Sequence, residues 1–276
     1  MVSYIELQGI AARIRMATFQ AIAQAGGGHF GGSLSVIEIL TALYFSALRV
    51  DPNNPQAHDR DRLVLSKGHG GPALYATLAE KGFFPKAWLS QLDTNGGRLP
   101  KHVDRLKVPG VDVSSGALGQ GLSVAVGMAL AAKLDSLDTR IYVVMGDGEC
   151  NEGQIWEAAM AASKYALCNV TGIVDLNRAQ VDGFSCDVMP LAPFAEKWQA
   201  FGWSVLTVDG HDIEQIVSAI EQAKKTIERP TVILAHTIKG KGVSFMEGRY
   251  EWHSGPVTRE QYKSAISDLE GVLEHD

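Results

Sequence analysis

Short apolar runs alternate along the chain with longer segments of helical periodicity. The runs predict buried strands over 62–66, 141–145, 170–176, 203–208 and 231–235. The longer segments predict helices over 4–25, 36–48, 72–81, 116–134, 152–166, 194–200, 213–227 and 258–273. Strands that are apolar on both faces and separated by helices indicate a doubly wound α/β fold. In that fold, helices cover both faces of a parallel sheet.

The pattern predicts one domain over residues 1–276, with an irregular region at about 83–115 that is rich in turn-forming residues. Residues 29–33 form a predicted loop before the helix at 36–48. Ser35 and Glu38 have the spacing of a capping box at the start of that helix.

Glycine-rich segments recur where predicted strands end or helices begin. There are four of them, at 67–72, 116–121, 146–153 and 237–242. Ligands of open parallel sheets bind outside the carboxyl ends of the strands. We therefore expect these loops to face one crevice, with backbone brought close to a ligand.

Composition excludes several classes of protein. The net charge is −6 and no basic patch is present, which argues against a nucleic-acid-binding protein. No apolar run reaches the roughly 18 residues of a membrane span, and the first residues carry no signal-peptide pattern. The three cysteines form no CxxC pair, so we expect reduced thiols and a cytoplasmic protein.

A carboxylate stands at the turn after the strand 141–145. Asp147 lies between two glycines there, and Asn177 follows the next strand. Magnesium prefers oxygen ligands and is often held by one or two carboxylates together with phosphate oxygens. The oxygens of Asp147, Asn177 and the Ala179 carbonyl are therefore candidate metal ligands. The N–H of Gly148 and the helix start that follows it favour a phosphate.

Two other interpretations of this turn remain open from the residues alone. A dinucleotide site needs G-x-G-x-x-G and an acid at the next strand. Gly146 and Gly148 fit, and Asp175 is a possible acid, but residue 151 is asparagine rather than glycine. In the second interpretation, Asp147 only caps a helix.

The motifs taken together resemble a known family. Gly146-Asp-Gly148 is separated from Asn177 by the 28 residues 149–176, a spacing similar to the thiamine-diphosphate signature. His29, Ser66-Lys-Gly-His69, Lys101-His102, Gly116–Gly121, Lys239-Gly-Lys-Gly242 and His253 come in the order found in the amino-terminal part of transketolase. The resemblance covers nearly the whole chain.

The resemblance implies a role for each matching residue. It implies that Mg²⁺ or Ca²⁺ is bound by Asp147, Asn177 and the Ala179 carbonyl. It implies that thiamine diphosphate is bound by Lys67, His69, Gly116, Ala117, Leu118, Asp147, Gly148, Glu149, Asn177, Lys239 and His253. It implies that the reacting carbon and substrate hydroxyls are surrounded by His29, His69, His102 and His253. The remaining histidines are expected to be structural: His58, His211, His236 and His275.

The resemblance also implies a partner. Transketolases move a two-carbon ketol unit between sugar phosphates, and a second domain supplies the glutamate that activates the cofactor. This chain matches only the first domain. We therefore expect an amino-terminal, diphosphate-binding subunit that is active with a second chain carrying the other domains, as an α₂β₂ assembly. Glu152 matches an acid that faces the other active site. Phe30 and Ala117 stand where members of the family often have proline, so the resemblance does not identify the substrate.

Two other functions are weighed beside this one. The α subunit of a 2-oxoacid dehydrogenase also binds thiamine diphosphate, but the histidine set and the Lys239–Gly242 loop argue against it. A catalytically silent cofactor-binding or assembly subunit is the second alternative.

Overall fold

The computed structural model describes residues 2–273, which are organised around a five-stranded sheet. The strands are β1 (Arg62–Leu65), β2 (Ile141–Gly146), β3 (Val170–Leu176), β4 (Ser204–Asp209) and β5 (Thr231–His236). They lie in the order β1-β2-β3-β5-β4, and every neighbouring pair is parallel. The predicted parallel α/β sheet is therefore confirmed.

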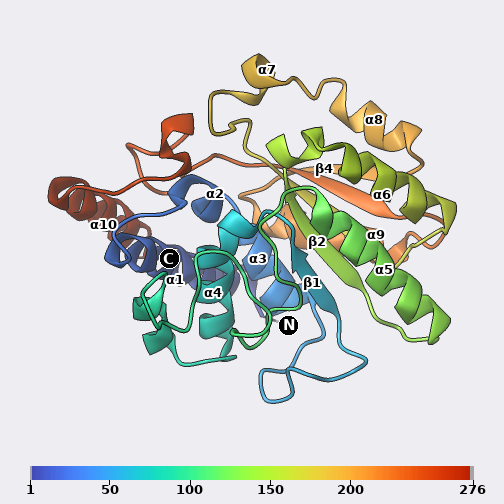
Figure 1. Ribbon diagram of the computed structural model, residues 1–276, viewed down its shortest axis with the longest axis horizontal. Helices are drawn as coiled ribbons and strands as arrows, with labels where there is room; N and C mark the ends of the chain where they lie inside the picture. The colour runs from blue at the N-terminus through green and yellow to red at the C-terminus, as the bar shows by residue number, and fades with distance from the viewer. Residues whose placement is uncertain (1, 274–276) are drawn as a thin grey trace.

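Helices connect the strands and cover both faces of the sheet (Figure 1). The α-helices are α1 (Tyr4–Gln24), α2 (Phe30–Leu34), α3 (Ile37–Ala42), α4 (Gly71–Lys81), α5 (Gln120–Leu134), α6 (Gly153–Lys164), α7 (Ser185–Val188), α8 (Phe194–Ala200), α9 (Ile213–Lys225) and α10 (Arg259–Leu273). The short π and 3₁₀ turns are η1 (Leu43–Ala47), η2 (Gly68–Gly70), η3 (Lys86–Gln91), η4 (Gly148–Asn151) and η5 (Tyr250–His253).

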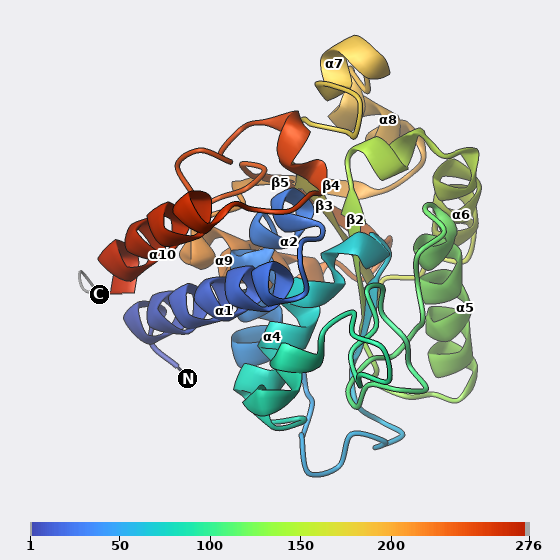
Figure 2. The ribbon, with the colours of Figure 1, turned by 60° about the vertical axis from the view of Figure 1, so that its left-hand side comes forward.

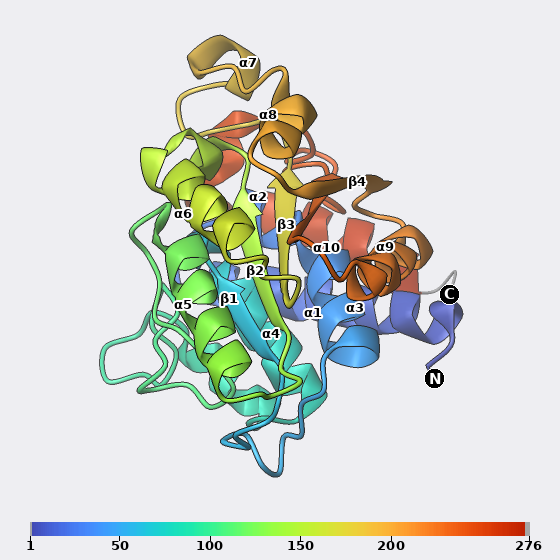
Figure 3. The same cartoon turned by 90° about the vertical axis from the view of Figure 1, so that its right-hand side faces the viewer.

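Each face of the sheet packs into its own apolar core. One core joins the sheet to α1, α3, α4, α9 and α10, and the other joins it to α5, α6 and α8. Figures 2 and 3 show these helices on opposite sides of the strands. All six residues of β2 are buried. Tyr142 and Val144 point into the first core, while Val143 and Met145 point into the second. This double burial explains why the strands are apolar at every position.

The carboxyl ends of the parallel strands meet at one edge of the sheet. The segments after β1, β2, β3 and β5 all leave from this edge, and α7 stands out beyond it at the top of Figure 1. Three of the four glycine-rich loops lie in those segments, and the fourth leads into α5. The fold therefore brings together the loops that the sequence singled out.

The segment 29–48 differs from the prediction. The expected loop at 29–33 contains α2, and the expected helix at 36–48 is α3 followed by the π-helical turn η1. The predicted capping box is wrong, because Val36 occupies the N-cap position and no side chain caps the helix. Ser35 is fully buried and donates its hydroxyl to Asp175. Glu38 pairs with Arg15 instead. Buried ionised partners hold these two side chains more strongly than a helix end does.

Within residues 2–273, no helix is both long and apolar enough to cross a membrane.

Candidate active site

A cavity of about 320 Å³ opens at the carboxyl edge of the sheet. Ten of the residues predicted for the site line it: Lys67, His69, Leu118, Asp147, Gly148, Glu149, Asn177, Ala179, Lys239 and His253. They come from the segments after β1, β2, β3 and β5, from the turn before α5, and from η5. The structure therefore places most of the predicted residues around one space.

Asp147 joins the two loops that were expected to hold the metal. Its side chain is 2% exposed and follows directly after β2. Oδ1 accepts a hydrogen bond from the Gly148 N–H at 2.8 Å. Oδ2 accepts one from the Arg178 N–H at 2.8 Å and one from the Ser185 hydroxyl at 3.0 Å. Burial raises the pKa of Asp147, and the negative charge of Asp175 raises it further. A cation beside this carboxylate would offset both the cost of burying its charge and the repulsion from Asp175.

The other two expected metal ligands lie on the turn after β3. The Asn177 side-chain nitrogen donates to Asp175 at 2.9 Å, and its oxygen accepts from the Ala179 N–H at 3.2 Å. Arg178, between them, has a φ of 62°, in the left-handed region that non-glycine residues rarely adopt. The Ala179 carbonyl accepts a hydrogen bond from Lys239 at 2.8 Å. Such unusual backbone often marks a ligand site.

Two buried lysines give the cavity positive charge. Lys67 is 1% exposed and Lys239 is 2% exposed. The Lys67 ammonium donates to the Gly32 carbonyl at 2.9 Å and to Asp175. The Lys239 nitrogen lies 3.2 Å from His253 Nδ1. Burial, together with the charge of Lys67, lowers the pKa of Lys239 to about 8, so Lys239 is mostly protonated near neutral pH. The two ammonium groups are suitable partners for an anionic ligand.

The four histidines predicted to be catalytic form one cluster. The ring of His29 lies 5.6, 5.5 and 5.4 Å from the rings of His69, His102 and His253, measured between centroids. His69 and His253 are 5.2 Å apart. His29 Nδ1 is buried and has no hydrogen-bond partner among the described residues. His29 and His102 do not line the cavity, so the cluster reaches it through His69 and His253.

These histidines are neutral near physiological pH. Burial is the main cause and lowers the pKa of His29 to about 4 and that of His253 to about 3. It also places the pKa of His69 well below its ordinary value and lowers the pKa of His102. Positive neighbours, including Lys239 beside His253, add to the effect. Neutral imidazoles can both donate and accept hydrogen bonds and can take up a proton.

Glu149 holds three loops together. Its carboxylate accepts hydrogen bonds from the Ser66 hydroxyl and from the N–H groups of Gly119 and Gly146, both at 2.9 Å. The side chain is 3% exposed, and burial raises its pKa. Glu149 lines the cavity as predicted, and its carboxylate ties the segment after β1 and the turn before α5 to the turn after β2. The contacts therefore favour a bracing role over a cofactor contact.

The loop before α5 lies at the rim of the cavity. Leu118 lines the cavity and is 37% exposed, while Gly116 and Ala117 are exposed outside the lining. A Cβ atom at Gly116 would lie 3.6 Å from the ring of His102, so these two residues are neighbours. Glu152 is exposed and reaches the cavity from the start of α6.

Several residues that meet at the site were not predicted from the sequence. Asp175 is fully buried and receives hydrogen bonds from Ser35 and Thr237. The amide nitrogen of Gln180 is buried without a partner among the described residues. It faces Gly148, where an added Cβ would lie 2.9 Å from Gln180 Cγ. Asp175 was considered from the sequence only as the acid of a dinucleotide site, and the only sequence signal of Gln180 was its place just after a predicted strand.

Two of the histidines expected to be structural make contacts away from the cavity. His211 Nδ1 lies 3.0 Å from a Glu38 oxygen, and its Nε2 accepts the Ile238 N–H at 2.8 Å. His236 contacts Arg178 at 3.2 Å. His275 lies outside the described residues.

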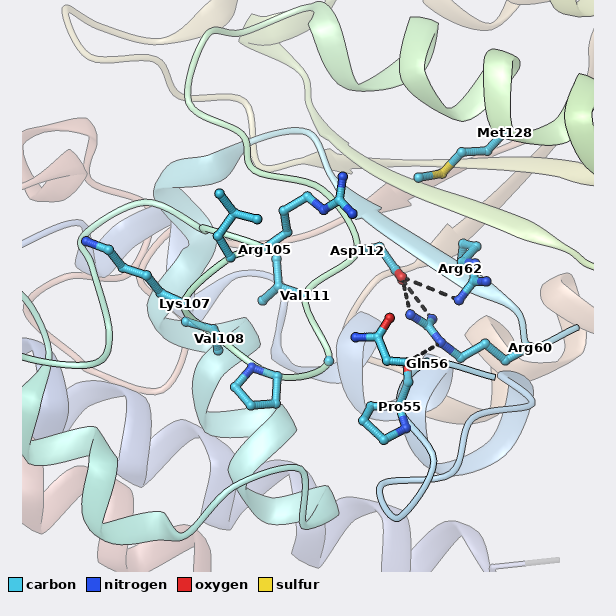
Figure 4. A pocket seen from close by; sticks show the side chains of 13 residues that line it. Pro55, Gln56, Arg60, Arg62, Arg105, Lys107, Val108, Val111, Asp112 and Met128 are labelled. Atoms are coloured by element: carbon cyan, nitrogen blue, oxygen red, sulfur yellow. Dashed lines mark hydrogen bonds and ion pairs between the residues drawn. The ribbon is translucent and has the colours of Figure 1, made fainter. Parts of the chain in front are cut away.

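A second cavity, of about 650 Å³, lies beside the start of β1 and the 105–112 loop, and contains none of the predicted site residues. Figure 4 shows Arg60 and Arg62 turned toward Asp112. Arg60 forms two hydrogen bonds with Asp112, at 2.5 and 3.2 Å, and Asp112 also accepts the Leu63 N–H at 2.9 Å. This pairing fixes part of the irregular 83–115 region against the first strand.

Comparison with known proteins gives consistent matches. Residues 7–270 match the family described as transketolase, thiamine diphosphate binding domain. A 6-deoxy-6-sulfo-D-fructose transketolase subunit of Clostridium sp. (strain MSTE9) is 51% identical over 266 residues, which cover 96% of this chain and 97% of that protein. A subunit of the apulose-4-phosphate transketolase of Phocaeicola vulgatus is 45% identical, with 99% of this chain and 96% of that protein covered.

Longer transketolases also match. Human transketolase is 38% identical over 95% of this chain and 42% of its own length. A solved structure of Pichia stipitis transketolase has a TM-score of 0.91 and 30% identity, and the match covers 96% of this chain and 40% of that one. This chain thus spans about two fifths of the length of these longer proteins. The chain belongs to the transketolase family and corresponds to its amino-terminal, thiamine-diphosphate-binding part.

Proposed function

We propose that this chain is the cofactor-anchoring subunit of a two-chain transketolase that transfers a two-carbon ketol unit between sugars or sugar phosphates. The observation that carries the proposal is the meeting of two groups of residues at one cavity. One group holds Asp147, Asn177 and two buried lysines, and the other is the cluster of neutral histidines, of which His69 and His253 line the cavity. Relatives of nearly the same length are named transketolase subunits.

The residues at the cavity fit thiamine diphosphate and a divalent metal. The buried carboxylate of Asp147, the amide oxygen of Asn177 and the Ala179 carbonyl are the hard oxygen ligands that Mg²⁺ prefers. The amide nitrogen of Gln180, which has no partner among the described residues, and the ammonium of Lys239 both belong to side chains that line the cavity and could meet diphosphate oxygens. When bound, the cofactor supplies a thiazolium that acts as an electron sink for carbon–carbon bond cleavage.

The histidines are the groups that accept and donate protons in this proposal. Because their pKa values lie below neutrality, the four imidazoles are unprotonated before substrate arrives and can accept a hydroxyl proton. The ring of His253 lies 5.4 Å from that of His29, and its Nδ1 lies 3.2 Å from the Lys239 nitrogen. Positioned acid–base groups of this kind contribute about 10²–10⁴-fold to rate.

A partner chain is part of the proposal. Three relatives that match this chain nearly end to end are named as subunits, while human transketolase extends well beyond the matched part. We propose that the second subunit carries the remaining domains and that the two chains assemble as α₂β₂.

Calorimetry of thiamine diphosphate binding with Mg²⁺ tests the anchoring site. Asp147→Ala should weaken metal-dependent binding by more than about 100-fold, since it removes a metal ligand rather than a supporting group. Its circular dichroism spectrum should stay that of a folded chain. Asp135→Ala, which removes an exposed acid at the end of α5, is the matched control and should bind like the wild type. Unchanged affinity in Asp147→Ala would refute the metal assignment.

Activity measurements test the two-chain assembly. Ketol transfer should require the partner subunit, and full activity of this chain alone would contradict that part. If cofactor binds but no ketol transfer occurs with the partner present, the chain is a silent binding subunit. Preference for a 2-oxoacid over a ketose donor would favour the dehydrogenase alternative.

A further inference from the structure

Asp175 is a buried carboxylate beside the cavity that the proposed chemistry does not use. It is fully buried, on β3, two residues before Asn177. Oδ2 accepts hydrogen bonds from the Ser35 hydroxyl at 2.7 Å, from the Asn177 side-chain nitrogen at 2.9 Å and from the Lys67 ammonium. Oδ1 accepts one from the Thr237 hydroxyl. A single carboxylate thus collects four side-chain donors.

The donors come from four separate parts of the fold. Ser35 precedes α3, Lys67 follows β1, Asn177 follows β3 and Thr237 follows β5. A buried charge is costly unless it is paired and hydrogen-bonded. The Lys67 ammonium meets the pairing requirement, and the other three donors meet the hydrogen-bonding requirement. The network therefore fixes the relative positions of three loops that surround the cavity.

Asp175 also decides which way the Asn177 amide faces. An ionised carboxylate can only accept hydrogen bonds, so the amide group that faces it must be the NH₂ and not the oxygen. The oxygen is consequently turned the other way, where it meets the Ala179 N–H at 3.2 Å. A cation needs that oxygen, because an amide nitrogen carrying two hydrogens cannot ligate it.

Lys67 is fixed in the same way. Two of its three ammonium hydrogens go to the Gly32 carbonyl and to Asp175. One donor is left, on a side chain that lines the cavity. Asp175 therefore holds both a candidate metal ligand and a candidate diphosphate ligand in a defined orientation.

We propose that Asp175 is a positioning residue that presents the Asn177 oxygen to the metal and the Lys67 ammonium to the diphosphate. The inference rests on the proposed function, since it assigns a role toward the same cofactor. It predicts that Asp175 acts through Asn177 and Lys67 without touching the ligand.

The test compares Asp175→Asn with Ser35→Ala in the full chain. Asparagine has the same shape, but its single oxygen cannot accept from all four donors. Affinity for Mg²⁺, titrated at a fixed concentration of thiamine diphosphate, should fall about 10–100-fold, as expected for loss of a group that orients a metal ligand. Ser35→Ala removes one donor to the same carboxylate but leaves Asn177 and Lys67 held, so its affinity should stay close to that of the wild type.

A second readout needs no ligand. The side-chain NH₂ of Asn177 should be protected from hydrogen exchange in the wild type and in Ser35→Ala, and should exchange faster in Asp175→Asn. If Asp175→Asn does not fold because Lys67 is left buried without a counter-charge, Lys67→Gln/Asp175→Asn is compared with Lys67→Gln. The double variant should still bind Mg²⁺ about tenfold more weakly than the single one.

The outcomes separate this inference from the proposed function. Wild-type Mg²⁺ affinity in a folded Asp175→Asn variant would overturn the positioning role and leave the proposed function intact. Equal losses in Asp175→Asn and Ser35→Ala would also overturn it, because they would indicate a general structural role. Absence of binding in the wild-type chain would overturn the proposed function and this inference with it.

Discussion

Replacing Glu149 with glutamine tests whether this side chain braces the cavity or contacts the cofactor. The carboxylate accepts from the Ser66 hydroxyl and the Gly119 N–H on one oxygen, and from the Gly146 N–H on the other. Glutamine keeps one acceptor oxygen and turns the other into a donor. If its oxygen faces Ser66 and Gly119, its NH₂ faces the Gly146 N–H, so the Gly146 N–H loses its acceptor and the new NH₂ finds none there.

The magnitude follows from that lost contact. A buried donor left without a partner costs about 1–3 kcal/mol. Burial raises the pKa of Glu149, which shows that the charged form is disfavoured by its surroundings, so removing the charge returns part of the cost. We expect the free energy of unfolding to fall by about 2 kcal/mol. For a chain of this length that lowers Tm by about 4–8 °C.

Urea and thermal unfolding near neutral pH measure this effect, followed by tryptophan fluorescence and circular dichroism. Glu157→Gln is the matched control, because it makes the same chemical change on the exposed face of α6 and should leave stability unchanged. Wild-type stability of Glu149→Gln combined with a large loss of thiamine diphosphate affinity would refute the bracing role. That result would show a direct contact with the cofactor.

Two further predictions concern charge. On folding, the pKa of His29 falls from 6.5 to about 4 and that of His253 falls from 6.5 to about 3. The unfolded chain therefore binds more protons than the folded chain below pH 6.5. The free energy of unfolding should fall as the pH drops from 6.5 toward these lowered pKa values. Urea midpoints across this range should decline less steeply in His29→Asn, and a flat wild-type profile would contradict the reasoning. Asp112→Ala should lower the free energy of unfolding in urea by about 3–5 kcal/mol, because Arg60 is left buried without its acidic partner. The control Asp138→Ala removes a side chain that is 90% exposed and should cost less than about 1 kcal/mol. Equal costs would argue against the buried pair.

The sequence predicted most of the elements because their patterns are long and clear. The five strands lie within about one residue of the predicted runs, since burial on both faces leaves few polar positions to confuse the pattern. The segment 29–48 was predicted less well. There every residue from 30 to 44 is buried, so no polar face marks the break between α2 and α3, and Ser35 at that break donates to a carboxylate 140 residues away.

The position of the site was also accessible from the sequence. Loops after parallel strands share one edge, so the strand pattern alone was enough to place Asp147 and Asn177 together. The resemblance to transketolase implied that Glu149 binds the cofactor. Its two hydrogen bonds to distant loops, from Ser66 and Gly119, indicate bracing and could not be anticipated because they depend on how α5 packs against β1.

What the sequence determined by itself was the order of strands and helices, the glycine loops, and the residue types available for metal, diphosphate and proton chemistry. The tertiary structure decided how those groups behave. Burial makes the clustered histidines neutral, which no local pattern reveals. Asp175 collects donors from four segments and sets the orientation of Asn177. The burial of a side chain and its hydrogen-bond partners depend on residues far apart in the chain. pKa values and side-chain orientation are therefore properties of the folded state.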